Sequence, residues 1–244
     1  MFKKNYIAGT IILILLIIVL VLLAALNVLK VLNQDTQANI SESDDVILKK
    51  TSDAGQSYID KLYFVGDSTT YHFFKGGIDK SHLLVPSSYT LYLESSVCDV
   101  LVGETGLTIP EAIKEYDAEY VIITIGVNGA DRFTEIQYKT YYNKLINAIK
   151  LTSPSTKIII QSVFPVAKWY SDKDNGITND GINRLNRWLK EIAREQGLPY
   201  LDTQSILKDT NGAMISEYDE GDGVHMNAKA YSLILEYIRT HAYK

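Results

Sequence analysis

Cysteine is almost absent from this chain of 244 residues, because Cys98 is the only one. A single cysteine cannot close an intramolecular disulfide, and it cannot assemble a zinc site built on cysteines. The acidic residues Asp219, Glu220 and Asp222 lie close together in the sequence but lack a recognised ligand spacing. We therefore predict no metal and no cofactor, and we expect stability to come from packing.

Clusters of positive charge are absent as well. The net charge is -5, and no stretch concentrates Lys and Arg into a face that could neutralise phosphates. The composition therefore predicts no nucleic-acid partner.

The N-terminal segment lacks charge altogether between Lys4 and Lys30, and most of its residues are Ile, Leu, Val and Ala. About 24 residues at a rise of ~1.5 Å give roughly 36 Å, which exceeds the hydrocarbon core of a bilayer. We predict a transmembrane signal anchor over residues 6–29. Residues 1–5 would stay in the cytoplasm, because Lys3 and Lys4 precede the apolar run.

A cleaved signal peptide is the alternative interpretation of this segment. The apolar run is longer than the core of a usual signal peptide, and Leu23-Ala24-Ala25-Leu26 is a poor cleavage site. Residues 30–59 are mainly polar and predict an extracytoplasmic linker. The folded domain would then occupy residues 60–244, on the outer side of the cell membrane.

From residue 60 onward, short apolar runs alternate with segments of helical periodicity. This alternation is typical of a parallel sheet covered by helices on both faces, and it predicts an α/β domain, a three-layer α/β/α sandwich with about five short strands. The expected strands are Leu62–Val65, Val97–Val102, Tyr120–Ile125, Lys157–Ser162 and Tyr200–Leu201.

Three helices are expected between and after these strands. Thr134 and Gln137 form a capping-box pattern that Phe133 and Tyr138 could staple. A second helix ends at Gly197, and a third begins near Asn227. The apolar faces comprise Tyr138, Tyr141, Leu145 and Ile149 in the first helix, and Ile182, Leu185, Leu189, Ile192 and Ala193 in the second.

A serine directly follows the first expected strand, in Gly66-Asp67-Ser68. Ser68 would lie at the carboxyl edge of the sheet, where open α/β folds bind their ligands. The tripeptide alone favours the alternative, a turn at the end of the strand in which Asp67 or Ser68 caps a helix.

An acid and a histidine lie three residues apart near the other end of the chain, at Asp222 and His225. If Asp222 accepts a hydrogen bond from one ring nitrogen of His225, it fixes the tautomer and stabilises the imidazolium that forms when a serine is deprotonated. The alternative is an Asp-Gly turn followed by a structural histidine. Ser68 favours the first interpretation, because the three groups together make a nucleophile and its base.

Two glycine-containing loops could supply hydrogen-bond donors to an oxyanion. Gly103-Glu104-Thr105-Gly106 and Gly126-Val127-Asn128-Gly129 each follow an expected strand. Glycine lets a backbone N–H approach a substrate closely, and the asparagine side chain can donate without carrying charge. Loop closure and a simple turn are the alternatives.

In this order the four segments resemble the SGNH/GDSL hydrolases, over roughly residues 60 to 244. The resemblance implies a flavodoxin-like fold, with Ser68 as the nucleophile and His225 and Asp222 completing a triad. It also implies an oxyanion hole made by the N–H of Ser68, the N–H of Gly106 and the side chain of Asn128. Gly103 is an alternative to Gly106.

Two residues depart from the family pattern. Thr69 stands where the family nickname has Leu, and Gly129 stands where the third block commonly has Asp. Ser68 is not surrounded by Gly-x-Ser-x-Gly, so the α/β-hydrolase elbow is not expected.

The resemblance implies a serine esterase that acts through an acyl-enzyme intermediate, and the N-terminal segment predicts that this esterase is membrane-anchored. We expect O-acetyl esters of cell-envelope glycans as substrates, and Tyr71 and His72 as substrate-binding residues. The alternatives are a lysophospholipase, a hydrolase of small acyl esters, or a non-catalytic glycan-binding or scaffolding module. The expected partners are thus an acylated glycan or lipid and the membrane.

Overall fold

The structure is a computed structural model that describes residues 22–26, 45–103, 106–173 and 175–243. The chain divides into two units, residues 1–45 and 46–244. In the first unit, residues 22–26 are helical and exposed. The predicted anchor at 6–29 lies mainly outside the described residues, and none of the helices that are described has the length and apolar character needed to cross a membrane.

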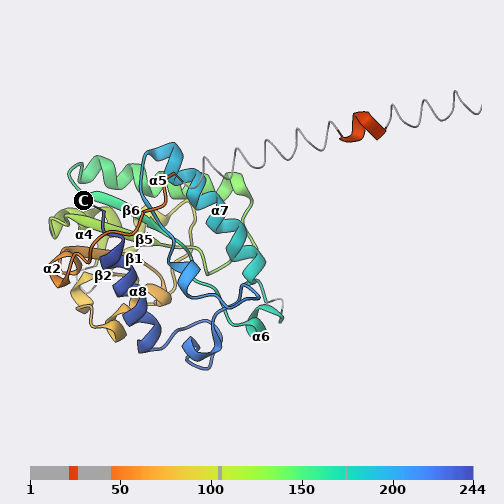
Figure 1. The fold of residues 1–244 in the computed structure, drawn as a ribbon. Coiled ribbons are helices and arrows are strands. Elements are labelled where there is room, and N and C mark those ends of the chain that lie inside the picture. The colour runs from red at the N-terminus through yellow and green to blue at the C-terminus, as the bar shows by residue number, and fades with distance from the viewer. Residues whose placement is uncertain (1–21, 27–44, 104–105, 174, 244) are drawn as a thin grey trace, which may run out of the picture. The chain divides into compact units, whose positions relative to one another are not determined.

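The second unit is built on a five-stranded parallel sheet, which confirms the predicted fold class (Figure 1). The strand order is β2-β1-β5-β6-β7, the order of a doubly wound flavodoxin-like sheet. Neighbouring strands are parallel throughout, and Gly66 at the end of β1 pairs with Thr124 at the end of β5. The strands are β1 (Leu62–Gly66), β2 (Leu83–Leu84), β5 (Tyr120–Thr124), β6 (Lys157–Gln161) and β7 (Tyr200–Leu201).

One predicted strand is wrong. Residues 97–102 do not join the sheet: Val97–Asp99 form a 3-10 turn, and β3 (Leu101–Val102) pairs antiparallel with β4 (Leu107–Thr108) in a separate hairpin. The fifth strand of the sheet is β2, which lies at the edge and pairs only with β1. The sequence analysis missed β2, which comprises only Leu83 and Leu84.

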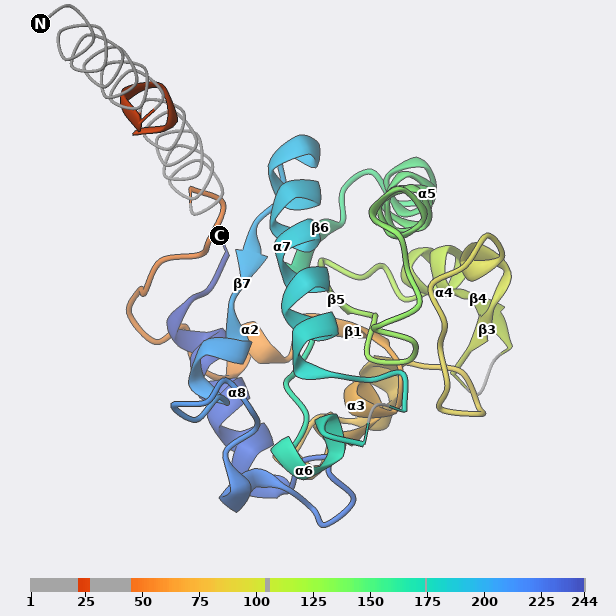
Figure 2. The same ribbon diagram turned by 90° about the vertical axis from the view of Figure 1, so that its right-hand side faces the viewer.

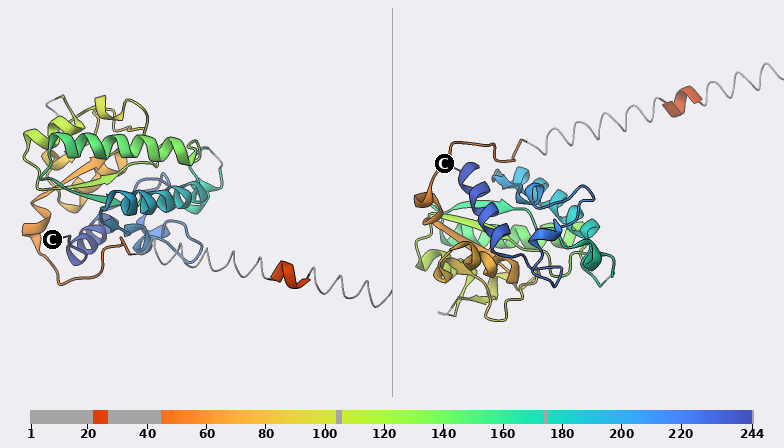
Figure 3. Two further views of the ribbon diagram at one scale, coloured as in Figure 1. Left: turned by 90° about the horizontal axis from the view of Figure 1, so that it is seen from above. Right: turned by 60° about the horizontal axis from the view of Figure 1, so that its bottom comes forward.

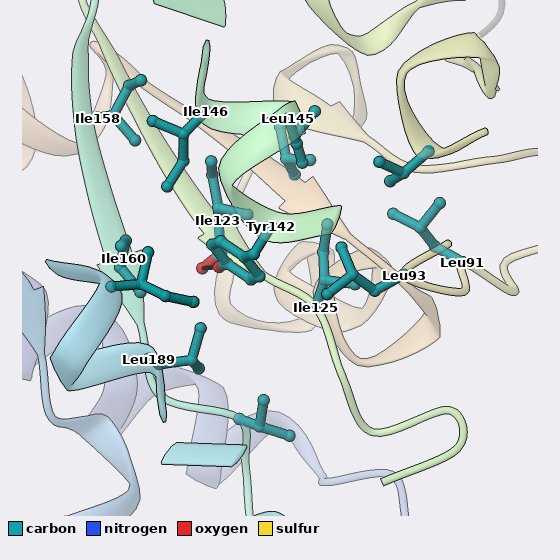
Figure 4. Close-up of a cluster of buried hydrophobic side chains, with 14 of the residues drawn as sticks. Leu91, Leu93, Ile123, Ile125, Tyr142, Leu145, Ile146, Ile158, Ile160 and Leu189 are labelled. Atoms are coloured by element: carbon teal, nitrogen blue, oxygen red, sulfur yellow. Dashed lines mark hydrogen bonds between the residues drawn. The ribbon is translucent and has the colours of Figure 1, made fainter. Parts of the chain in front are cut away.

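Helices cover both faces of the sheet (Figures 1 and 2). Alternate residues of the strands belong to the cores of opposite layers. Val121 and Ile123 of β5 pack toward α4, α5 and α7, whereas Tyr120 and Ile122 pack toward α2 and α8. The first of these layers is centred on Ile123, Tyr142, Leu145, Ile146, Ile158, Ile160 and Leu189 (Figure 4). The helices are α2 (Gln56–Ile59), α4 (Ile109–Glu115), α5 (Glu135–Thr152), α7 (Asn179–Gln196) and α8 (Ala228–Thr240).

The three predicted helices are confirmed with their caps. Thr134 caps α5 in a capping box with Gln137, and the Phe133 and Tyr138 rings meet edge to face at 5.5 Å. Gly197 ends α7 in the left-handed conformation, and Asn227 caps α8. One detail differs, because the core face of α5 presents Tyr138, Tyr142, Leu145, Ile146 and Ile149, while the predicted Tyr141 is only half-buried.

Residues 46–59, which the sequence analysis places in the linker, belong to the second unit, which starts at Val46 (Figure 3). Ile47 forms a parallel bridge with Tyr200, and Leu48 N–H donates to the Tyr200 carbonyl at 2.9 Å. Val46-Ile47-Leu48 is the apolar part of a polar segment, and it covers the otherwise open edge of β7.

Candidate active site

β1 and β5 are neighbours in the sheet. From β1 the chain adds β2 on one side and then β5, β6 and β7 on the other, so the strand order reverses between β1 and β5. Sheets of this order bind their ligands at the carboxyl ends of the strands beside this point. β1 leads directly into α3 (Ser68–Tyr71) through Gly66 and Asp67. A Cβ atom on Gly66 would lie 2.0 Å from Thr70 Oγ1 and 2.4 Å from the Thr124 carbonyl oxygen. Only glycine therefore permits α3 to lie this close to the two strands. Several short helical segments flank the strands: η1 (His72–Gly76), η2 (Lys80–His82), α6 (Lys168–Ser171), η4 (Thr203–Ile206) and η5 (Ser216–Tyr218).

Asp67 caps α3 and fixes the start of the helix. Its Oδ1 accepts hydrogen bonds from Thr69 N at 3.0 Å and from Thr69 Oγ1 at 2.7 Å, and the side chain is buried. The helix-cap interpretation of Asp67 is thus correct, and it leaves Ser68 as the first residue of the helix. The Thr69 hydroxyl satisfies a buried carboxylate oxygen, which a leucine at this position could not do.

The buried Asp67 carboxyl predicts a pH-dependent stability. Burial raises the pKa of Asp67 from 3.8 to about 6, against the lowering effect of the hydrogen bonds from Thr69. A carboxyl with a higher pKa in the folded than in the unfolded state stabilises the fold while protonated, and this contribution is lost as pH rises through about 4 to 6. Over that range the loss amounts to about 3 kcal/mol.

Asp67→Asn removes this titration and keeps an oxygen that can accept from Thr69. Urea denaturation at about pH 4 and pH 7 should show the free energy of unfolding of the variant improving relative to wild type by about 3 kcal/mol as pH rises. A difference between the two proteins that stays constant with pH would show that Asp67 does not titrate in this way.

Ser68, His225 and Asp222 are hydrogen-bonded in series, although 157 residues separate the serine from the histidine. Ser68 Oγ lies 2.7 Å from His225 Nε2, and His225 Nδ1 lies 2.6 Å from Asp222 Oδ2. Partial burial raises the pKa of Asp222, but hydrogen bonds from His225 and Val224 outweigh it and hold the pKa below its ordinary value. Asp222 is therefore ionised at neutral pH, so Nδ1 carries the ring proton and Nε2 is left to accept from Ser68.

The loop that carries the acid and the histidine is held by its own hydrogen bonds. Asp222 Oδ1 accepts from the backbone N–H groups of Val224 and His225, both at 2.8 Å. Gly223 has φ +83°, and a Cβ at this position would lie 2.6 Å from Tyr170 Cβ. Glycine thus allows the loop to adopt a left-handed turn against α6. In this turn the Gly223 carbonyl accepts a hydrogen bond from Ala167 N at 2.8 Å.

His72 contacts the ring of His225. The two ring centroids are 4.6 Å apart at an interplanar angle of 63°, and His72 Nδ1 is buried without a hydrogen-bond partner among the described residues. Burial, Lys75 and His225 lower the pKa of His72 to about 4. His72 is therefore neutral at physiological pH and packs against the side of His225. The neighbouring Tyr71 contacts Tyr89, with ring centroids 4.2 Å apart and the ring planes tilted by 40°.

The backbone N–H groups predicted as oxyanion donors differ in the hydrogen bonds they make and in their place in the fold. Gly103 N–H donates to the Val85 carbonyl at 3.1 Å, so the alternative donor is already engaged. Gly106 has φ +67° and directly precedes β4, next to residues 104–105, which lie outside the described part of the chain. Ser68 begins α3, and the N–H of the first helical residue has no acceptor within its helix.

Asn128 follows β5 and lines a pocket of about 350 Å³ together with Gly129 and Arg132. Its Nδ2 donates a long hydrogen bond of 3.4 Å to the Leu91 carbonyl, which leaves the second proton of the amide available. Gly129 has φ +83°, a conformation that glycine adopts without strain and aspartate does not. The departure at Gly129 therefore fits the local backbone.

The sequence analysis missed a buried polar network beneath this edge of the sheet. Thr124 Oγ1 donates to Gln161 Oε1 at 2.8 Å, and Gln161 Nε2 donates to Thr203 Oγ1 at 3.0 Å. The network continues to Ser162, whose Oγ accepts from Gln204 N at 2.8 Å. The polar pair Gln161-Ser162 at the end of an apolar strand was the only sequence signal for it. The network fixes the carboxyl ends of β5 and β6 relative to each other.

A serine, an imidazole and a carboxylate linked in this way, at the carboxyl edge of a parallel sheet, define the chain as a serine hydrolase with a flavodoxin-like strand order. The model of the GDSL-like lipase/acylhydrolase family matches residues 64–233, and the chain belongs to this family. It is an ester-hydrolysing enzyme, so the prediction of a serine esterase is confirmed and the non-catalytic alternative is not retained.

Two solved structures illustrate the shared fold. A candidate platelet activating factor from Streptococcus pneumonia is similar with a TM-score of 0.53 at 15% identity, covering 90% of this chain and 98% of its own. A GDSL-like lipase from Bacteroides thetaiotaomicron gives 0.51 at 16% identity, covering 82% of this chain and 92% of its own. A search of curated proteins by sequence finds no match.

Proposed function

We propose that this chain removes O-acetyl groups from cell-envelope glycans, with Ser68 as the nucleophile, His225 as the general base and Asp222 as the residue that orients the histidine. The observation that carries the proposal is the continuous series of hydrogen bonds from Ser68 through His225 to Asp222. His225 Nε2 takes the proton of Ser68 as Oγ attacks the ester carbonyl carbon. The resulting imidazolium is stabilised by Asp222 and then protonates the sugar oxygen as its bond to the acyl carbon breaks, so that the sugar leaves with a free hydroxyl.

The acyl-enzyme is resolved by water. His225 Nε2 accepts a proton from the attacking water molecule, and the second tetrahedral intermediate collapses to release acetate while Ser68 Oγ recovers its proton from His225. Ser68 N–H, Gly106 N–H and the Asn128 amide would donate to the oxyanion of both intermediates.

Asn128→Ala tests the oxyanion role. We expect turnover of p-nitrophenyl acetate to fall by roughly two to three orders of magnitude, because one donor to the developing negative charge is lost. The exposed turn residue Asn211 provides the matched control, and Asn211→Ala should retain turnover. If Asn128→Ala turns over as fast as wild type, this residue does not stabilise the oxyanion.

We also propose that the N-terminal apolar segment anchors the enzyme in the cell membrane with its catalytic domain outside. The support is the uncharged run between Lys4 and Lys30 and the positive residues before it. Protease added to intact cells should then degrade the catalytic domain and spare a cytosolic control protein. Full protection of the domain in intact cells, with degradation after lysis, would contradict this topology.

The substrate is tested by acetate release. The full chain should liberate acetate from O-acetylated peptidoglycan, while the Ser68→Ala protein sets the blank. A lysophospholipid is assayed in parallel for release of fatty acid. An enzyme that cleaves p-nitrophenyl acetate and the lysophospholipid, but releases no acetate from the glycan, would replace the glycan substrate with a lipid.

A further inference from the structure

Three aromatic side chains are unusually exposed among the residues that the structure describes. Tyr89, Tyr92 and Trp169 are 42%, 46% and 45% exposed. All three lie in segments that follow carboxyl ends of strands: Tyr89 and Tyr92 follow β2, and Trp169 lies in α6 after β6. The exposed rings are therefore concentrated at the edge of the sheet that carries Ser68.

Tyr89 is connected to the catalytic histidine by a series of ring contacts. His225 contacts His72 at 4.6 Å, the His72 and Tyr71 centroids are 6.1 Å apart, and Tyr71 and Tyr89 are 4.2 Å apart. Tyr71 and Tyr89 line the wall of a cavity of about 770 Å³. The remaining lining mixes charged and hydroxyl groups with apolar ones, among them Asp79, Lys80, Ser81, Leu84, Pro86 and Ser87.

Trp169 lies against the loop that carries the acid and the histidine. A Cβ on Gly223 would lie 2.8 Å from Trp169 Cζ2, so the indole contacts the backbone between Asp222 and His225. Its Nε1 donates to Asp219 Oδ2 at 3.2 Å, which fixes the orientation of the ring, and Lys173 Nζ lies 4.3 Å from the ring centroid. The indole is thus held in place while almost half of it stays exposed.

The two aromatic positions lie on opposite sides of Ser68. In the strand order β2-β1-β5-β6, Ser68 follows β1, so the loop with Tyr89 lies on the β2 side and α6 with Trp169 lies on the β6 side. In Figure 2, α3 appears between α6 and the yellow loop that follows β2. In the direction across the strands, Ser68 therefore lies between the two rings.

We infer that Tyr89 and Trp169 are specificity-determining residues that hold a polysaccharide chain on both sides of Ser68, so that the enzyme deacetylates internal sugars in preference to short fragments. This inference rests on the proposed function and extends it. Sugar rings offer apolar faces that pack on aromatic rings, and hydroxyl groups that pair with side chains such as Asp79, Lys80 and Ser87. A fatty acyl chain would require a continuous apolar lining, which the cavity beside Tyr71 does not provide.

The test compares two lengths of the same substrate on the full chain. The specificity constant kcat/KM for acetate release is measured on long O-acetylated peptidoglycan strands and on the single O-acetylated disaccharide. Wild type should prefer the long strand by about tenfold or more. Tyr89→Asn and Trp169→Ala should each reduce this preference about threefold, because each removes one stacking surface. Asn tolerates the left-handed backbone of Tyr89, which has φ +57°.

Two features make the comparison decisive. The preference for the long strand is a ratio of two kcat/KM values measured on one protein preparation, so partial loss of folded enzyme cancels. The reductions caused by Tyr89→Asn and Trp169→Ala should multiply in the double variant, because the two side chains lie on opposite sides of the site. Leu151 on α5 is 84% exposed and provides the control, since Leu151→Ala should leave the preference unchanged.

Failure of this inference and failure of the proposed function give different results. A wild type that cleaves both substrates equally, or a preference that neither variant reduces, overturns the inference and leaves the esterase proposal intact. A wild type that reacts with neither substrate, but cleaves a lysophospholipid, overturns both.

Discussion

Replacing Ser68 with alanine is expected to reduce ester hydrolysis by about four orders of magnitude or more and to abolish covalent labelling by a fluorophosphonate. The reason is that Ser68 Oγ forms the acyl-enzyme in the proposed mechanism, and its 2.7 Å hydrogen bond to His225 Nε2 supplies the proton acceptor for its attack. Hydrolysis of p-nitrophenyl acetate and gel detection of the labelled full chain measure the two effects.

Ser232 provides a matched control for this substitution. It is exposed on α8, where its hydroxyl donates only to the Ala228 carbonyl of the same helix at 2.9 Å. Ser232→Ala should therefore label and hydrolyse like wild type. Labelling of the Ser68→Ala protein would assign the nucleophile to a different residue, and absence of labelling in folded wild type would exclude the acyl-enzyme mechanism.

Asp222→Asn is expected to lower kcat by about 10³- to 10⁴-fold at neutral pH. The asparagine oxygen can still accept from the N–H groups of Val224 and His225, so the turn remains. Its NH₂ group would face His225 Nδ1, however, and would require that nitrogen to be an acceptor. The ring proton then moves to Nε2, which can no longer accept the proton of Ser68.

Asp209 provides the control, because its carboxylate holds a similar turn but has no hydrogen bond to His225. Asp209 Oδ1 accepts from Asn211 N at 2.8 Å and Ala213 N at 3.0 Å, an arrangement like that of Asp222 Oδ1. Asp209→Asn should retain kcat in the p-nitrophenyl acetate assay. Equal losses in the two variants would show that Asp222 acts through the fold of its loop and not through the tautomer of His225.

Local sequence patterns predicted the central elements of the fold well. β1, β5 and β6 are continuous apolar runs with buried residues on both faces, and the caps of α5, α7 and α8 lie within a residue or two of each helix boundary. The patterns failed where the choice of strand partner decides the structure. Residues 97–102 are apolar enough for a strand, but they pair with β4 in a hairpin, and the edge of the sheet is taken by the two residues of β2.

The site shows the same division between local and distant interactions. Ser68, Asp222 and His225 could be predicted because each has a motif of its own, and the structure brings them together. Thr69, which satisfies Asp67, and Trp169, which packs on Gly223, carry no motif. The choice between Gly103 and Gly106 depended on the Val85 carbonyl, 18 residues before Gly103, and no spacing rule could have identified that acceptor.

The attachment of residues 46–59 has a mechanical consequence. Tension on the chain before Val46 enters the domain at β7, through Leu48 and Tyr200, and at the C-terminal end of α8, where Thr51 N–H donates to the Thr240 carbonyl. Sheet order places β5 and β6 between β7 and β1, and the length of α8 separates Thr240 from His225 by about 20 Å at ~1.5 Å per residue. A pull from the N-terminal side therefore acts first on the far edge of the sheet and on the end of α8 that is remote from His225.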